Sequence, residues 1–404
     1  MGSWASDAKA AAGRSLAELP ALSTIEEDWR FTSPEDLALD GIEPANGAGG
    51  SGSLPAAPAS RIGYLTATDG VVGETGPGTL PDGVIVCDLA TAVADHEALV
   101  KNRLYGLVGF DTKPGALNAA HWDAGLFVYV PRGVQVELPA EALTYVTGAA
   151  GRVYGRTLVV VEDGAKATVV DRYTSADVAS TVQVSTVVEL YVGEGAELEH
   201  LSIVDWGAGV RHHATLRAVT GKDAKVRSVV VTLGGDVVRV EPTVVLRGSG
   251  GDARALGLFF ASGDQHFEHR VVSRHEAPNA YSNLLYKGAI QDHARTIFYG
   301  NLVVPPGAPG TDAYQTNRNL VLNEGARAET IPFLEIETAE VKCSHAGAVG
   351  RVDDEHLFYL QSRGVPRDTA KRLIVEGFLQ EVLAQVTFPE LREELQAAIA
   401  KKVR

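Results

Sequence analysis

The sequence predicts a mainly β protein whose body is a solenoid, with helical segments at both ends. Two observations carry this prediction. From Leu126 to about Gly350, Val-rich runs of four to eight residues, such as TLVVVE and VRSVVVTL, alternate with Gly, Asp and Pro, which is typical of short strands. A turn-like unit ending in alanine also recurs before many of these runs, at Ala165, Ala196, Ala224, Ala253, Ala294 and Ala326.

The spacing of these alanines favours stacked coils. Successive differences in residue number are 31, 28, 29, 41 and 32, close to two short strands plus their turns. A repeat of this length indicates a solenoid in which a small residue fits where adjacent coils approach. A β-sandwich with strands of similar length is the competing interpretation.

Composition limits the class of protein. The 404 residues are 45% hydrophobic and 22% charged, enough to bury a large core in two to three domains or one elongated repeat. The net charge of -15 opposes nonspecific binding to nucleic acid or anionic membranes and favours protein partners. Neither a signal peptide nor an apolar run of about 18 residues is evident, and two cysteines cannot form a disulfide framework. We therefore expect a soluble, cytoplasmic protein.

The chain divides into four expected segments. These are an N-terminal helical segment with a flexible linker (1–60), a small α/β lead-in (61–125), the β-helix core (126–350) and a C-terminal helical domain (351–404). Ser33 and Pro34 predict the start of a short helix, and the Gly/Ser/Pro/Ala-rich stretch 46–60 predicts the linker. The lead-in is expected to hold a strand at 84–86 and a helix at 90–100.

The C-terminal segment predicts three helices. The first ends at Gly364, the second starts at Val365-Pro366, and the third begins at FPELREELQ. The second helix carries one apolar stripe, consisting of Leu373, Ile374, Phe378, Leu379, Val382 and Leu383. This stripe is expected either to pack on the β-body or to dock another protein, and the sequence leaves both open.

The candidate site is the pair Cys343 and His345. The two residues lie two apart in a predicted strand, so their side chains share a face. A thiol and an imidazole are the softest metal ligands of a protein, but two ligands alone do not hold a metal. The other cysteine, Cys87, lies far upstream. A buried thiol beside a hydrogen-bonded histidine is therefore the structural alternative.

Other chemistry has weaker support. The scattered histidines His212, His213, His266, His269 and His275 are a poor metal site, because neighbours on a strand point to opposite faces.

Tyr281 to Lys287, with Gln315 and Asn317, is polar and aromatic. This set predicts either a lined interface or, preferably, a solvated face.

Nucleotide hydrolysis by this chain is not expected. Gly221-Lys222 is followed by Asp223, so there is no phosphate-binding loop. The sequence also has no H-E-x-x-H motif and no G-x-S-x-G nucleophile elbow.

Several motifs together resemble the SufB/SufD family of iron-sulfur cluster assembly proteins, with the closest resemblance to SufD. They are Tyr286-Lys287-Gly288, Asp312 to Leu320, Pro332 to Ile336, Lys342-Cys343-Ser344-His345 and Leu357 to Leu360. Ala326 stands where SufB-like chains carry a cysteine, and the Lys-Cys-Ser-His form is the SufD one.

The resemblance implies a right-handed parallel β-helix flanked by helical domains. It implies a non-enzymatic scaffold that pairs with SufB through the β-helix and with the ATPase SufC through the C-terminal helices. His345 is then a candidate ligand for iron or for a transient iron-sulfur cluster shared with SufB, and Cys343 is the second choice. Whether a flavin binds, which sulfur donor serves the complex and whether the chain homodimerises without SufB stay open.

Two alternatives accompany this interpretation. One is a β-helical polysaccharide-active enzyme, which would need clustered carboxylates on successive coils. The other is a purely structural partner of SufB without a ligand role.

Overall fold

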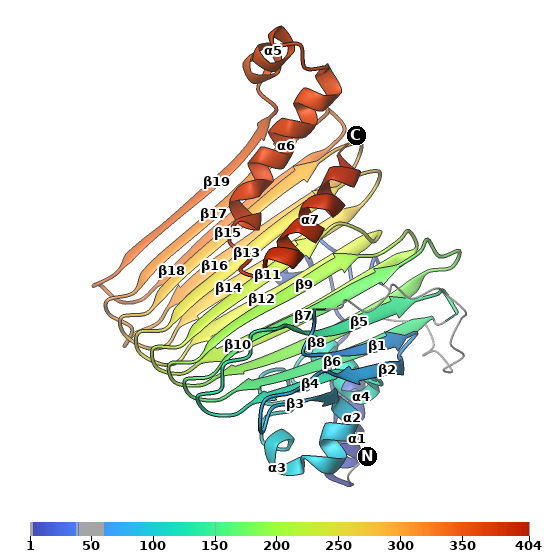
Figure 1. The fold of residues 1–404 in the computed structure, drawn as a ribbon, viewed down its shortest axis with the longest axis vertical. Helices are drawn as coiled ribbons and strands as arrows, with labels where there is room; N and C mark the ends of the chain where they lie inside the picture. The colour runs from blue at the N-terminus through green and yellow to red at the C-terminus, as the bar shows by residue number, and fades with distance from the viewer. Residues whose placement is uncertain (1–2, 38, 40–59, 150, 404) are drawn as a thin grey trace.

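The computed structural model describes residues 3–37, 39, 60–149 and 151–403, and Figure 1 shows their arrangement. From β4 to β19, successive strands alternate between two sheets, so each coil contributes one strand to each sheet, and the neighbours are parallel apart from the pairs β1–β2 and β3–β4 at the N-terminal end. The mainly β solenoid with helices at both ends is confirmed. The predicted linker at 46–60 lies outside the described residues, except for Ser60.

The first sheet has ten strands, which follow one another in space from the C-terminal to the N-terminal end. They are β19 (Lys342–Arg351), β17 (Asp312–Val321), β15 (Tyr281–Ile290), β13 (Asp252–Ala261), β11 (Lys225–Thr232), β9 (Glu197–Asp205), β7 (Lys166–Ser175), β5 (Ala140–Val146), β1 (Gly63–Thr68) and β2 (Val71–Pro77). All neighbours are parallel except the β1–β2 hairpin.

The second sheet has nine strands. They are β18 (Arg327–Ile336), β16 (Arg295–Val304), β14 (His266–His275), β12 (Val237–Leu246), β10 (Val210–Thr220), β8 (Val182–Val192), β6 (Arg152–Val161), β4 (Leu126–Val130) and β3 (Ile85–Asp88). Segment 61–125 therefore supplies the outermost strands of both sheets at the N-terminal end.

A column of small residues forms one corner of the solenoid. The carbonyl of Ala165 accepts a hydrogen bond from the amide of Glu197 (2.9 Å), and that of Ala196 accepts one from Lys225 (2.8 Å). Both alanines are buried, as expected for a small residue where adjacent coils meet. Ala224 continues the column towards β13.

The irregular gap of 41 residues has a structural reason. Beyond Ala224 the column continues with Gly251 and Ala280. Ala253 instead lies inside β13, while Ala294 precedes β16 in the other sheet. The alanines that recur in the sequence therefore do not all belong to one column, because some lie at one corner of the solenoid and some at another.

The N-terminal helices cover the outer face of the nine-stranded sheet. They are α1 (Ser3–Glu18), the 3-10 helix η1 (Glu27–Trp29), α2 (Leu89–Asp95), α3 (Glu97–Val100) and α4 (Lys113–His121). The prediction of a helix starting at Ser33 and Pro34 is wrong, because only a turn forms there. Leu37 and Leu39 are both buried, and side chains two residues apart do not lie on one helix face.

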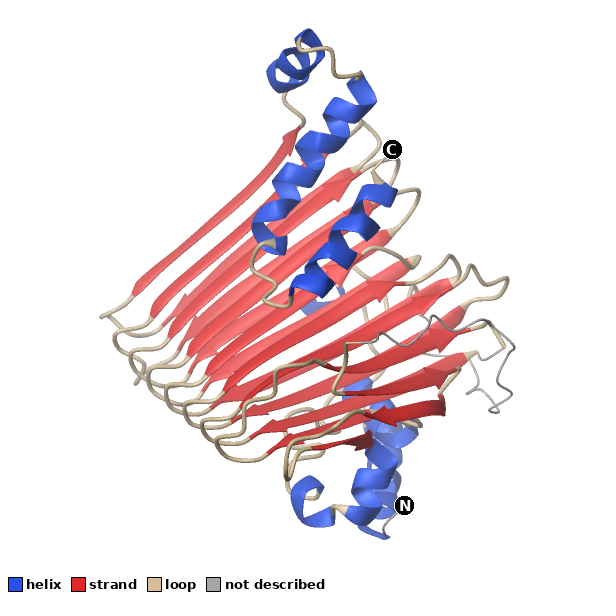
Figure 2. Cartoon of the chain, viewed as in Figure 1, coloured by secondary structure: helices blue, strands red, loops and turns tan. Residues whose placement is uncertain are grey.

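Three helices follow the last strand, as predicted: α5 (Asp354–Ser362), α6 (Arg367–Leu383) and α7 (Pro389–Lys402). α6 and α7 lie on the outer face of the ten-stranded sheet, whereas α5 projects beyond its end (Figure 2). None of the helices in the described ranges is long and apolar enough to span a membrane.

Candidate functional site

Cys343 and His345 lie on β19, the last strand of the ten-stranded sheet. Cys343 pairs with Ala313 and His345 pairs with Gln315 on β17. Both partners are buried in the solenoid interior. Because in-register parallel strands keep equivalent side chains on the same face, Cys343 and His345 both point towards the interior, at the end where no further coil covers it.

The two side chains have different environments. Cys343 is half-buried and packs against the interior hydrophobic core. Burial, and secondarily the carboxylate of Asp312, raise the pKa of its thiol, so the thiolate that would bind a metal is disfavoured at neutral pH. His345 is exposed and makes no side-chain hydrogen bond or ion pair with the described part of the chain. Of the two, His345 is the more available ligand.

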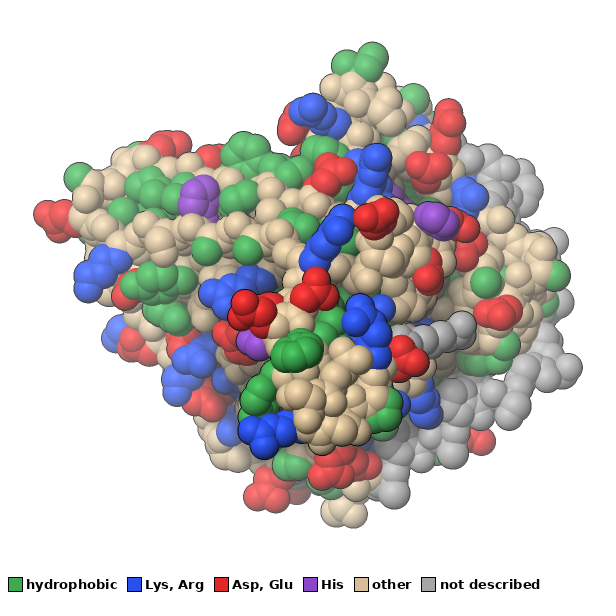
Figure 3. Space-filling model, turned by 90° about the horizontal axis from the view of Figure 1, so that it is seen from above, with side chains coloured by type: hydrophobic (Ala, Val, Ile, Leu, Met, Phe, Trp, Pro, Cys, Tyr) green, Lys and Arg blue, Asp and Glu red, His purple; other side chains and the backbone are tan. Residues whose placement is uncertain are grey.

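This end of the solenoid has an apolar character. Four large hydrophobic side chains on or beside its last strands are exposed, namely Tyr314, Phe333, Ile336 and Val349. Hydrophobic side chains gather on this end of the molecule in Figure 3. β18 and β19 each have a strand neighbour on one side alone within the described chain. An edge of this kind is a template for pairing with another chain.

A complete metal site is not formed by the described residues. No group of three or more His, Cys, Asp or Glu side chains among them could hold a metal ion. Cys87 lies on β3, at the opposite end of the solenoid from Cys343. Among the described residues, His345 and Cys343 therefore have no third His, Cys, Asp or Glu beside them to complete a metal site.

The apolar stripe of α6 divides into two parts. Leu379, Val382 and Leu383 are buried against the outer face of the ten-stranded sheet, so this part packs on the β-body. Leu373, nearer the start of α6, is 47% exposed. Helix packing therefore accounts for most of the predicted stripe, and only its beginning is open to a partner.

Comparison with known proteins identifies the family. The model of the SUF system FeS cluster assembly SufBD core domain matches residues 144–378, more than half of the chain, and the model of the SufBD protein N-terminal region matches residues 61–141. The chain belongs to the SufBD family.

Curated relatives agree with this assignment. An iron-sulfur cluster assembly SufBD family protein of Mycobacterium tuberculosis is 42% identical over 287 residues, covering 69% of this chain and 71% of the relative. The iron-sulfur cluster assembly protein SufD of Bacillus subtilis is 31% identical over 328 residues, covering 80% of this chain and 74% of the relative. This SufBD chain is therefore similar to a SufD protein along most of its length.

The other histidines of this SufBD chain do not converge on a site. His212 lies in the solenoid interior, where it hydrogen-bonds Thr186 (2.9 Å) and accepts from the indole N–H of Trp206 (3.1 Å). His213 points to the outer face and stacks on Trp29. The prediction that this pair faces in opposite directions is confirmed.

The polar and aromatic set on β15 and β17 is not a solvated face. Tyr286, Gln315 and Asn317 are fully buried, and the Asn317 amide donates to the carbonyl of Tyr286 (3.2 Å). The preferred interpretation is wrong because alternate residues of these strands point into the closed solenoid. This polar interior precedes the open end that holds His345.

Burial of two interior histidines predicts that acid weakens this SufBD fold. Burial lowers the pKa of His212 and of His269 to about 3, below the ordinary 6.5. The unfolded chain therefore binds more protons than the folded one below pH 6.5, so stability falls as the pH drops. Between pH 7 and 5.5 we expect each histidine to lower the free energy of unfolding by roughly 1 kcal/mol.

Denaturant unfolding at several pH values tests this expectation. His269→Gln removes one of the two groups, so its loss of stability between pH 7 and 5.5 should be smaller than that of the wild type. The exposed His356 on α5 offers a control, because His356→Gln should keep the wild-type pH profile. Identical profiles for all three proteins would contradict the assignment.

Proposed function

We propose that this chain is a SufD-type, non-catalytic scaffold subunit of the SUF system. It pairs with a SufB-type partner through the open end of its solenoid and helps to hold a nascent iron-sulfur cluster, which is the cargo of the assembly. The observation that carries the proposal is the position of His345. It is an exposed, inward-pointing imidazole on the edge strand β19, which pairs with β17 on one side and has no strand neighbour on its other side within the described chain.

The donor set fits a shared cluster rather than a resident one. His345 offers an imidazole, and Cys343 offers a second donor whose thiol is held protonated by burial. With no further ligand gathered beside them in the described ranges, the remaining ligands are assigned to the SufB-type partner. A cluster bound partly by imidazole carries less negative charge than one bound by thiolates alone, which favours its transfer onward.

A charged side chain introduced at the open end of the solenoid tests whether the SufB-type partner binds there. Val349 on β19 is 46% exposed and lies on the inward face of the strand, because it pairs with the buried Asn319 of β17. We expect Val349→Lys to abolish co-elution with a SufB-type partner in size-exclusion chromatography, because an unpaired charge would be buried in the contact. Val71→Lys is the matched control, since Val71 is equally exposed (46%) on β2 at the opposite end.

Retained co-elution of the Val349→Lys variant would remove this end from the interface. A homodimer formed without SufB is assigned to the same surface, so it should dissociate in this variant as well.

The ATPase contact is assigned to α5 and the beginning of α6. Phe358 and Tyr359 on α5 are 73% and 57% exposed, and Leu373 on α6 is also open. Exposed aromatic side chains of this size are typical of interface anchors. A SufC-type ATPase is the proposed partner because this chain has no phosphate-binding loop of its own.

Removal of the two aromatic anchors should weaken that contact strongly. We expect Phe358→Ser combined with Tyr359→Ser to lower affinity for a SufC-type ATPase by at least about tenfold, since interface aromatics are frequent hot spots. Circular dichroism should stay unchanged, because neither side chain is buried. Ile25→Ser removes a 94% exposed side chain outside α5 and α6 and should not alter binding, whereas equal affinities for all three proteins would refute the assignment.

Family membership gives no support to the polysaccharide-active alternative. The purely structural role is separated from the ligand role by the behaviour of His345 variants. We assign the protein to the cytoplasm, where cysteines such as Cys87 and Cys343 stay unpaired.

A further inference from the structure

A cavity of about 530 Å³ lies between the N-terminal region and the outer face of the nine-stranded sheet. Its walls come from residues 19–29, from residues 107–114 and from strands β10, β12, β14 and β16. β10, β12 and β14 lie in the middle of the nine-stranded sheet, and β16 is the neighbour of its last strand, β18. The volume falls in the range of small-molecule sites, and the proposed assembly function leaves it unused.

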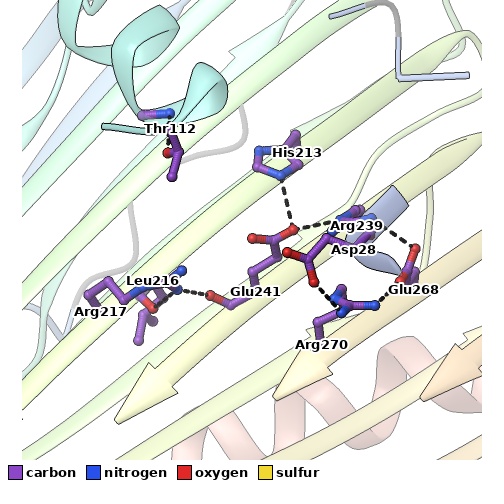
Figure 4. A network of polar contacts seen from close by, with 10 residues as sticks. Asp28, Thr112, His213, Leu216, Arg217, Arg239, Glu241, Glu268 and Arg270 are labelled. Atoms are coloured by element: carbon purple, nitrogen blue, oxygen red, sulfur yellow. Dashed lines mark hydrogen bonds and ion pairs between the residues drawn. The ribbon is translucent and has the colours of Figure 1, made fainter. Parts of the chain in front are cut away.

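Two of the three arginines in this cavity are held by acidic side chains. Arg239 bonds Glu241 (2.6 Å) and lies 3.3 Å from Glu268. Arg270 bonds Asp28 (2.6 Å) and also contacts Glu268 (3.3 Å). Figure 4 shows these contacts as one network. These carboxylates neutralise the charges of Arg239 and Arg270 and hold both side chains in place, so the two arginines line the cavity without offering a free charge to a ligand.

Arg217 on β10 differs from its neighbours. Its Nη1 group donates to the carbonyls of Leu216 (3.0 Å) and Glu241 (2.7 Å), which uses both hydrogens of that nitrogen. Its Nε and Nη2 groups have no acceptor in the described part of the chain, and no described carboxylate lies within the 4.0 Å of an ion pair. The side chain is nevertheless mostly buried, and this burial lowers its pKa despite the carboxylates of Glu241 and Asp111.

The unused side of Arg217 has a defined geometry. Nε and Nη2 present parallel N–H donors, the edge of a guanidinium that binds a carboxylate or a phosphate through two oxygens. Apolar side chains line the same cavity, including Leu22, Leu107 and Val108. A charged donor pair beside apolar walls suits a ligand with an anionic head and an uncharged body.

We propose that this cavity binds a small organic anion, whose carboxylate or phosphate group accepts hydrogen bonds from Nε and Nη2 of Arg217. The uncharged part of the ligand lies against Leu22, Leu107 and Val108. Asp111, which also lines the cavity, opposes the anion by charge repulsion. The site is independent of the cluster-binding role of His345.

Titration of the full-length chain with two probes tests the proposal. Phenyl phosphate and benzoate share an aromatic body and differ in the anionic head, so they separate phosphate from carboxylate recognition. Calorimetry measures affinity, and a change in tryptophan emission, to which Trp29 contributes from the cavity wall, reports occupancy. We expect saturation by at least one probe below about 10 mM, an affinity in the range of a single charged contact.

Three variants make the result specific. Arg217→Gln should weaken binding by about tenfold or more, because it removes the charged donor pair. Arg247→Gln is the control, since Arg247 lies on the exposed turn after β12, and it should bind as the wild type does. Asp111→Asn should bind more tightly. The proposal is overturned if neither probe saturates, if a natively folded Arg217→Gln variant binds as tightly as the wild type, or if Asp111→Asn weakens binding.

Discussion

Replacing His345 with alanine should leave the folding and subunit assembly of the complex intact and remove most of its iron and sulfide. The side chain is exposed and lacks a hydrogen-bond partner in the described chain, so its truncation leaves no buried polar group unpaired. The change in stability should stay within about 0.5 kcal/mol, as for other surface substitutions. Loss of a direct ligand should cost the complex at least about tenfold in cluster content, since even outer contacts of metal ligands have effects of that size.

Two further variants separate a ligand from a structural residue. His293→Ala removes another exposed imidazole, on the turn before β16, and should keep the wild-type cluster content. Cys343→Ala should lower the thermal midpoint slightly, because Cys343 packs against the core, while reducing cluster content less than the His345 variant.

The measurement is iron and acid-labile sulfide per complex, made anaerobically beside a thermal melt. Normal cluster content in His345→Ala would refute the ligand role. A lowered midpoint with proportionate cluster loss would instead favour the purely structural role.

Local periodicity was sufficient to predict much of this fold. The two-residue period of strands placed Cys343 and His345 on one face before any coil was known, and the register with Ala313 and Gln315 agrees. The same rule separated His212 from His213. These predictions succeed because they depend on neighbours in the chain alone.

Features that depend on the whole assembly of coils could not be read in the same way. Leu373 and Leu379 have the same character in the sequence, yet only Leu379 lies over the sheet. The exposure of His345 follows from where stacking ends, which the repeat spacing does not encode.

For the same reason, the sequence did not predict the cavity lined by Arg217, Arg239 and Arg270, here called the arginine cavity. Its ion pair between Asp28 and Arg270 joins residues 242 positions apart. Arg217 has no local motif around it, so its unused donors become apparent only when the N-terminal region is packed on the sheet.

The buried ion pair of Arg156 and Glu189 should be the most sensitive point of the N-terminal half. Neither side chain has any exposure, and Arg156 Nη2 lies 2.7 Å from Glu189 Oε2. The Glu189 carboxylate also accepts hydrogen bonds from the amides of Tyr105 (3.1 Å), Leu107 (2.9 Å) and Val108 (3.1 Å). One side chain of β8 therefore holds both a buried cation and the loop before α4.

Glu189→Leu is expected to destabilise this region by about 3–5 kcal/mol, because it leaves the buried Arg156 charge without its carboxylate, with only the neutral oxygens of Asn118 and Val108 as acceptors. Native-state hydrogen exchange measures the effect directly, since the amides of Tyr105, Leu107 and Val108 lose their acceptor and should exchange much faster. Amides of β17, many coils away, should keep their protection.

The double variant Arg156→Leu/Glu189→Leu should recover part of the lost stability, since it removes the buried Arg156 charge as well as the Glu189 carboxylate. If the single variant stayed within about 1 kcal/mol of the wild type, the pair would not anchor the N-terminal region. A double variant no more stable than Glu189→Leu would show instead that the three backbone hydrogen bonds, rather than the ion pair, fix the loop on which Leu107 and Val108 line the arginine cavity.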